Sequence, residues 1–154
     1  MKSLLLLIPF LFLSFSTYAD SEHPAFSNDI IKKSSTHSVK DTMDKLEKIV
    51  NKQGLTVFAR VDHRAGAKKV GLDMNDAELL IFGNPKMGTA IMKFDTAAGL
   101  DLPLRVLVYA DKKGKTWLSY HNPQSLRNYY DVAKSPALVM AEGALGKLTS
   151  KAAE

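Results

Sequence analysis

Asp62 and His63 are the adjacent residues of this sequence with the clearest capacity for chemistry. They directly follow an apolar run that ends at Val61, and side chains where a strand gives way to a loop can converge on a ligand. His63 could act as a general acid or base, or bind a metal ion, with a carboxylate orienting its ring. Neighbouring residues at a strand end point to opposite sides, so a direct relay is disfavoured. The structural alternative is that Asp62 caps a helical turn from Arg64 to Val70.

A second candidate site is the segment GNPKMGT, which begins at Gly83. Glycine lets a ligand approach the backbone closely, exposed amides could form an anion-binding concavity, and Lys86 could add positive charge. The segment lacks the spacing of a phosphate-binding P-loop, so it does not support nucleotide binding. The alternative needs only local sterics: a tight turn into a short helix, with Asn84 as its cap and Pro85 at its first position.

Tyr120 and His121 form a third candidate, at the end of an alternating segment. If that end lies near His63, the two histidines together with Met87 or Met92 could form a soft metal site of the copper type. Methionine at apolar positions usually fills a core, however. We therefore predict no metal site and no cofactor, and keep Tyr120 as a ligand-binding candidate.

Several classes of chemistry have no support in the sequence. There is no G-x-S-x-G elbow for a serine hydrolase, and no recognisable pair of carboxylates for glycoside hydrolysis. The absence of cysteine excludes disulfides, thiolate nucleophiles and cysteine-based zinc sites. The formal net charge of +5 comes from scattered lysines, so we expect no nucleic-acid partner.

Residues 1–19 have the pattern of a signal peptide. Lys2 supplies positive charge, Leu4 to Phe15 is apolar, and Thr17-Tyr18-Ala19 offers the small residues of a cleavage site. The apolar run is shorter than the roughly 20 residues that a spanning helix needs. We expect cleavage after Ala19, no stable membrane anchor afterwards, and a periplasmic or secreted product. Residues 20–28 are predicted to form a flexible leader before a single domain, 29–150.

The clearest helix of that domain is predicted from Ser38 to Gln53. Val39, Met43, Leu46 and Val50 fall on one helical face, and charged residues take the opposite face. Ser38 is a natural N-cap, and Gly54 can end the helix in a left-handed conformation.

Alternating and continuous apolar runs predict the strands. A short first strand contains Ile30 and Ile31, and four later ones occupy Leu55 to Val61, Glu78 to Phe82, Leu104 to Tyr109 and Lys115 to His121. In the second of the five strands, alternation would place Leu55, Val57, Ala59 and Val61 on one face. Asn122-Pro123 and Ser135-Pro136 then predict two helices, or one broken at Pro136. This order indicates an α+β domain whose mainly antiparallel sheet carries helices on one face.

Four segments in the same order, VFARVDHRAGAKKVGL, ELLIFGNPKMGT, GLDLPLRVLVYAD and GKTWLSYHNP, resemble the domain of unknown function 302 family. The resemblance spans roughly Ser38 to Tyr130. It implies a β-α-β4-α fold of the TATA-binding-protein-like type and a homodimer, and it brings no established activity.

Three hypotheses for function follow. The one we favour is a non-enzymatic, dimeric module of the cell envelope that binds a small ligand, with Asp62, His63 and Lys86 bordering the site. The second is an enzyme that uses His63 as acid or base, which requires a partner group within hydrogen-bond reach. The third is a purely structural or interaction protein, whose sheet pairs only with another copy.

Overall fold

The computed structural model describes residues 29–154. The predicted signal peptide and leader, with the cleavage site after Ala19, lie outside the described residues. None of the helices within residues 29–154 is both long enough and apolar enough to cross a membrane.

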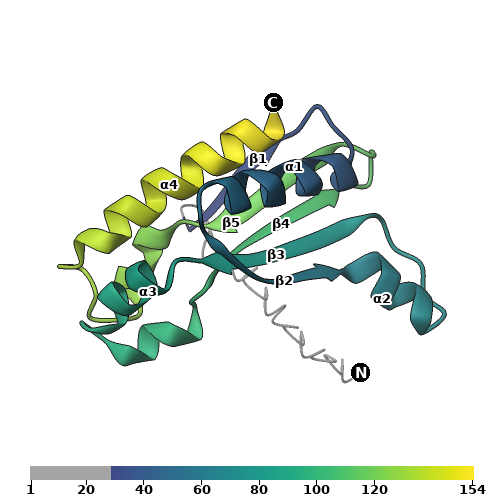
Figure 1. Ribbon diagram of the computed structural model, residues 1–154. Coiled ribbons are helices and arrows are strands. Elements are labelled where there is room, and N and C mark those ends of the chain that lie inside the picture. The colour runs from purple at the N-terminus through teal and green to yellow at the C-terminus, as the bar shows by residue number, and fades with distance from the viewer. Residues whose placement is uncertain (1–28) are drawn as a thin grey trace, which may run out of the picture.

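Five antiparallel strands form one sheet, as the sequence predicts (Figure 1). They are β1 (Ile30–Ser34), β2 (Thr56–Asp62), β3 (Ala77–Gly83), β4 (Leu104–Ala110) and β5 (Thr116–His121). Their order across the sheet is β1-β5-β4-β3-β2, so the first two strands of the chain lie at opposite edges. The connection between these edges is helix α1 (Val39–Lys52), which crosses one face of the sheet.

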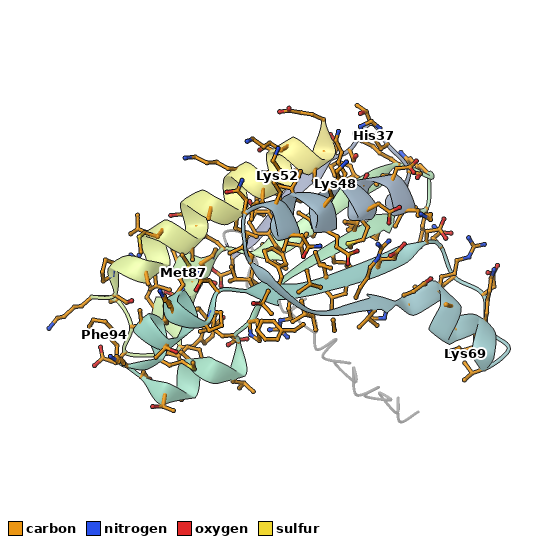
Figure 2. The ribbon with its side chains drawn as sticks, in the orientation of Figure 1. His37, Lys48, Lys52, Lys69, Met87 and Phe94 are labelled. Atoms are coloured by element: carbon orange, nitrogen blue, oxygen red, sulfur yellow. The ribbon has the colours of Figure 1, made fainter. Side chains whose placement is uncertain are left out.

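Helix α1 and helix α4 (Pro136–Ala153) cover the same face of the sheet (Figure 1). The predicted apolar face of α1 is buried there against strand residues such as Leu80, Phe82 and Leu118. Lys48 and Lys52 are exposed on the outer surface of α1 (Figure 2). The predicted ends of α1 are confirmed, because Ser38 Oγ accepts a hydrogen bond from the backbone N–H of Asp41, and Gly54 has a φ of 68°.

The C-terminal region is one 3₁₀ turn followed by one long helix. The turn, η2 (Pro123–Asn128), begins after Asn122, which caps it, and α4 begins at Pro136. Ser135 precedes α4 as predicted, but its buried hydroxyl makes no capping hydrogen bond. The remaining elements are α2 (His63–Lys69), α3 (Pro85–Met92) and η1 (Thr96–Leu100).

One strand prediction is wrong. Pairing between β2 and β3 shifts between Val57 and Ala59, so Phe58 is an extra residue in the ladder. Val57 therefore packs on the helix side, whereas Ala59 pairs with Ile81 on the opposite face. Simple alternation cannot reveal such a shift, because the bulge changes which face every later residue of the strand occupies.

Arg60 also reaches the helix side as a result of this shift. Its guanidinium hydrogen-bonds Glu78 on β3 at 2.6 Å and Glu47 on α1 at 2.8 Å, and it pairs with Asp44 at 2.7 Å. Burial lowers the pKa of Arg60, but the hydrogen bonds that its guanidinium donates to these carboxylates outweigh that effect and raise the pKa. Arg60 thus remains charged and ties α1 to the edge of the sheet.

The sheet face opposite the helices is apolar along β3. Leu80 and Phe82 point into the core, so Leu79 and Ile81 alternate to the other face, where they remain half-buried. Leu79 is flanked there by Val61 and Leu107. A continuous apolar strand is typical of a sheet that is covered on both faces.

Candidate functional site

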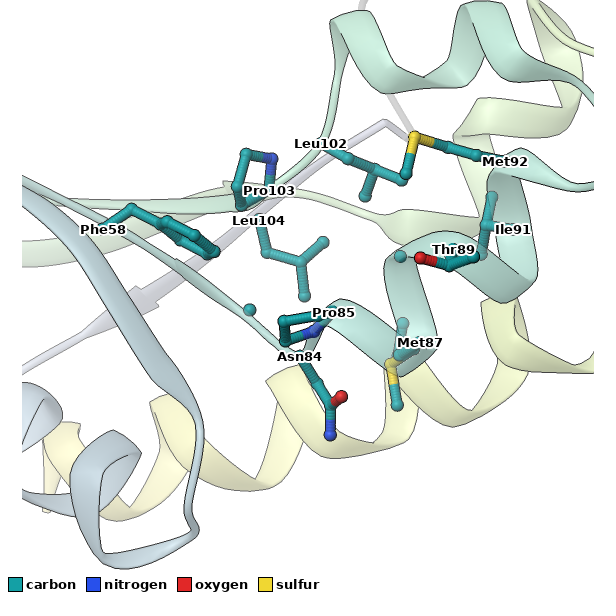
Figure 3. Close-up of a pocket in the computed structure, with 13 residues that line it drawn as sticks. Phe58, Asn84, Pro85, Met87, Thr89, Ile91, Met92, Leu102, Pro103 and Leu104 are labelled. Atoms are coloured by element: carbon teal, nitrogen blue, oxygen red, sulfur yellow. The ribbon is translucent and has the colours of Figure 1, made fainter.

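A cavity of about 320 Å³ opens where the end of β3, helix α3 and the chain entering β4 meet (Figure 3). Its lining comes from four parts of the chain that are distant in sequence. The lining residues are Phe58, Gly83, Asn84, Pro85, Met87, Gly88, Thr89, Ile91, Met92, Leu102, Pro103, Leu104 and Ala141. Only Asn84 and Thr89 carry polar side chains, so the cavity has the chemical character of an apolar binding site.

Local sequence fixes the wall formed by α3. Asn84 Oδ1 accepts a hydrogen bond of 2.9 Å from the backbone N–H of Lys86, and Pro85 occupies the first helical turn. The predicted turn and cap are therefore confirmed. The same turn places Gly83 and Asn84 in the cavity lining. Asn84 can therefore cap α3 and also contact a ligand in the cavity.

The opposite wall depends on the bulge in β2. Phe58, the extra residue, is 54% exposed and lines the cavity. A Cβ atom added at Gly83 would lie 3.5 Å from Cβ of Pro103 and 3.8 Å from Cε2 of Phe58. Both distances are ordinary van der Waals contacts, so packing in this wall does not require a glycine at position 83. The close approach of a ligand to the Gly83 backbone stays a prediction.

The cavity also has a position where a side chain has room to extend. A Cβ atom added at Gly88 on α3 would meet no atom within 4 Å. Lys86, by contrast, lies on the exposed side of α3 and is absent from the cavity lining. Met87 and Met92 line the cavity, but His63 and His121, the histidines of the possible metal site, do not.

Asp62 and His63 lie at the other end of β2. Asp62 Oδ1 accepts a hydrogen bond of 2.8 Å from the backbone N–H of Ala65, so Asp62 caps α2 as the structural alternative predicts. His63 is exposed in the first turn of α2 and lines neither of the cavities near α3 and β5. Arg64 pairs with Asp76 at 2.6 Å, which ties α2 to the chain entering β3.

The structure does not bring His63 and His121 together. Across the sheet, Asp62 pairs with Glu78, Glu78 with Val108, and Val108 with Leu118. His121 is three residues beyond Leu118, at the end of β5, so it is not level with His63. In addition, His63 follows β2 and His121 ends β5, and β3 and β4 lie between these two strands. Within residues 29–154, no group of three His, Asp or Glu side chains is close enough to hold a metal ion.

Tyr120 and His121 have different surroundings. Tyr120 is only 4% exposed and packs in the core, with Lys33 Nζ 5.8 Å from the centre of its ring. His121 is exposed and lines a second cavity of about 300 Å³ together with Asp101, Arg105 and Tyr130. Sequence reasoning identified only His121 of this group. Asp101 and Arg105 are close in sequence, but His121 and Tyr130 come from other segments and no motif joins the four residues.

Comparison with known proteins agrees with the fold. The family model described as "Domain of unknown function DUF302" matches residues 31–153. The crystal structure of an uncharacterized conserved DUF302 protein from Bacillus stearothermophilus is similar with a TM-score of 0.64 and 19% identity, covering 80% of this chain and 94% of that one. At this identity the likeness shows the fold alone.

Two curated relatives are fluoride-specific ion channels of Brucella. FluC 1 of Brucella suis biovar 1 (strain 1330) is 43% identical over 101 residues, which is 66% of this chain and 40% of that protein. FluC 1 of Brucella abortus biovar 1 (strain 9-941) matches with the same identity over 37% of its length. The matched part therefore spans about two fifths of the length of these relatives.

Proposed function

The chain belongs to the family of the domain of unknown function DUF302, and from the geometry of its cavity we propose that it is a non-enzymatic module that binds a small apolar molecule beside α3. The observation that carries this proposal is the lining of the cavity, in which eleven of the thirteen residues lack a polar side chain. Its volume of about 320 Å³ is at the lower end of the range for small-ligand sites.

The chemistry of the lining favours binding over catalysis. None of the lining side chains is an acid or a base that titrates near neutral pH, whereas general acid–base catalysis needs such a group beside the substrate. Burial of an apolar ligand is favourable by about 25 cal/mol for each Å² removed from water. Asn84 and Thr89 can orient a ligand that carries a single hydrogen-bonding group.

We further propose that the module is a dimer and works in the cell envelope. The half-buried apolar face of β3, with Leu79 and Ile81, supports the dimer, because a second copy would remove it from water. The envelope location rests on the signal-peptide pattern of residues 1–19. Both statements are extensions of the ligand-binding proposal and can fail independently of it.

An apolar fluorescent probe, N-phenyl-1-naphthylamine, tests the binding proposal directly. We expect its fluorescence to rise with the wild-type protein, and to rise equally with Gly88→Ala, which leaves the cavity open. Gly88 lines the cavity, and a Cβ atom added there meets no atom within 4 Å, so the ring of Gly88→Phe should occupy the cavity and abolish the enhancement. His63→Ala should bind like wild type, because His63 is exposed and outside the cavity. Equal binding by Gly88→Phe and wild type would reject the proposal.

The curated relatives favour a second candidate function. Because the matched proteins are named fluoride-specific ion channels, this chain could instead be an accessory module that acts with a fluoride channel. On this alternative, cells that lack the protein should be more sensitive to fluoride than wild-type cells, and equally sensitive to chloride. Unchanged fluoride sensitivity would remove this candidate and leave the apolar-ligand proposal intact.

A further inference from the structure

The second cavity, at the end of β5, differs in chemistry from the first. It has a volume of about 300 Å³ and shares Leu104 with the apolar cavity. Ile30, Leu104 and Leu126 give it an apolar wall, while Arg105 and His121 supply nitrogen donors. A site with this composition suits a ligand that has an apolar body and one charged end.

Asp101 organises the charged part of this cavity. Its Oδ2 accepts a hydrogen bond of 2.7 Å from the Tyr130 hydroxyl, and its Oδ1 accepts one of 3.1 Å from Arg105 Nη2. The hydrogen bond to Asp101 raises the pKa of Tyr130, so the phenol stays protonated and acts as a donor. Asp101 therefore fixes the position of Arg105 with one of its two oxygens.

Arg105 has donors left for a ligand. Within residues 29–154, only its Nη2 takes part in a side-chain hydrogen bond, and the Arg105 side chain is 45% exposed. Arginine presents its remaining N–H groups in a planar fork that matches a carboxylate. The ion pair with Asp101 orients the guanidinium group of Arg105 and leaves its other N–H groups available for a ligand.

His121 and Arg105 line the cavity from neighbouring strands. Leu107 and Ser119 form the last pair of the β4–β5 ladder on this side, and Arg105 and His121 each lie two residues beyond that pair. Because side chains alternate along each strand, both are on the sheet face of Leu107 and Ser119. One anionic group can therefore contact both side chains.

We propose that this second cavity binds a small monocarboxylate with an aromatic or aliphatic body, its carboxylate held by Arg105 and His121. The body of the ligand lies against Ile30, Leu104 and Leu126. Asp29 also lines the cavity, and its charge repels any anion there, dicarboxylates and phosphates more strongly than a monocarboxylate. The site shares only Leu104 with the apolar cavity and does not depend on the function proposed for that cavity.

Benzoate is a suitable probe, with benzyl alcohol as its neutral counterpart. We expect amide NMR shifts of the wild-type protein around the second cavity on titration with benzoate, and binding at least about tenfold weaker for benzyl alcohol, since hydrogen bonds between charged groups are stronger than those to a neutral hydroxyl. Arg105→Gln should weaken benzoate binding by a similar factor, and Arg105→Lys should restore part of it.

Arg64→Gln is the matched control, because Arg64 is also paired with one aspartate and lies outside both cavities, and its side chain is 39% exposed, against 45% for Arg105. It should bind benzoate like wild type, as should Gly88→Phe. Three results would overturn the proposal: no saturable benzoate binding, equal binding of benzyl alcohol, or equal losses in Arg105→Gln and Arg64→Gln. Heteronuclear NMR spectra of each variant establish that the fold is retained.

Discussion

The two ends of strands β2 and β3 are built in different ways. At the end with α2, polar contacts hold the chain: Asp62 caps the helix, Arg64 pairs with Asp76, and no residue of α2 is buried. At the end with α3, apolar side chains meet around a cavity, and Ile91 is only 1% exposed. The α2 end carries the reactive residue types, and Asp62 lines a hollow there whose other side chains are all charged. The α3 end instead has a cavity with a mainly apolar lining. A histidine next to a carboxylate in the sequence is therefore weak evidence of a functional site unless the histidine also lines a cavity in the folded protein.

The largest expected difference between the two ends is in packing. Ile91→Ala removes a buried side chain at the α3 end, and we expect a loss of about 2–5 kcal/mol in the free energy of unfolding. Val70→Ala at the end of α2 should change stability by less than about 0.5 kcal/mol, since Val70 is 71% exposed. Urea denaturation measures both values. Similar losses for the two variants would contradict the contrast.

The two helix caps offer a finer comparison. Asp62→Ala and Asn84→Ala each remove a side chain that accepts a backbone N–H, and each should cost about 1 kcal/mol in the free energy of unfolding. Only Asn84→Ala should also weaken binding of N-phenyl-1-naphthylamine, because Asn84 lines the cavity and anchors α3. Weaker binding by Asp62→Ala would instead return the α2 end to consideration as a ligand site.

The smallest effect concerns pH at the turn between β4 and β5, which lies at the same end of the sheet as α2. The indole N–H of Trp117 and the backbone N–H groups of Lys115 and Lys113 hydrogen-bond Asp111 and lower its pKa below the usual 3.8. A carboxyl group whose pKa is lower in the folded than in the unfolded protein stabilises the fold when the pH is above the unfolded-state pKa. This stabilisation is lost as the pH falls through the folded-state pKa. Wild type should therefore be more stable than Asp111→Asn at pH 7, and the difference should shrink as the pH falls below 3.8. Denaturation curves at several pH values test this, and a constant difference would refute the assignment.

Local sequence signals predicted most of the fold. The apolar spacing of α1, its cap at Ser38, and the Asn84-Pro85 start of α3 depend on contacts within a few residues, so they can be read from the chain. The predicted cap at Asp62 is of the same kind. These features are correct because local hydrogen bonding determines them.

The cavities were not predictable in the same way. Phe58 reaches the first cavity because β2 contains a bulge, and Leu102, Pro103 and Ala141 join it from segments far apart in the sequence. The Arg105–Asp101 pair is local, but Tyr130 reaches Asp101 from 29 residues further along the chain, so its part in this cluster depends on the fold. Tyr120, chosen for its place beside His121, is in the core, because alternate residues of a strand face opposite sides of the sheet.

Native mass spectrometry of the protein isolated gently from its own cells is the most direct test of the central proposal. The wild-type protein and Gly88→Ala should both carry a small organic molecule of reproducible mass, and Gly88→Phe should carry none. The same spectra report whether the protein is a dimer. Retention of the same molecule by Gly88→Phe, or bare protein in all three samples, would contradict the proposal that the cavity beside α3 is the binding site.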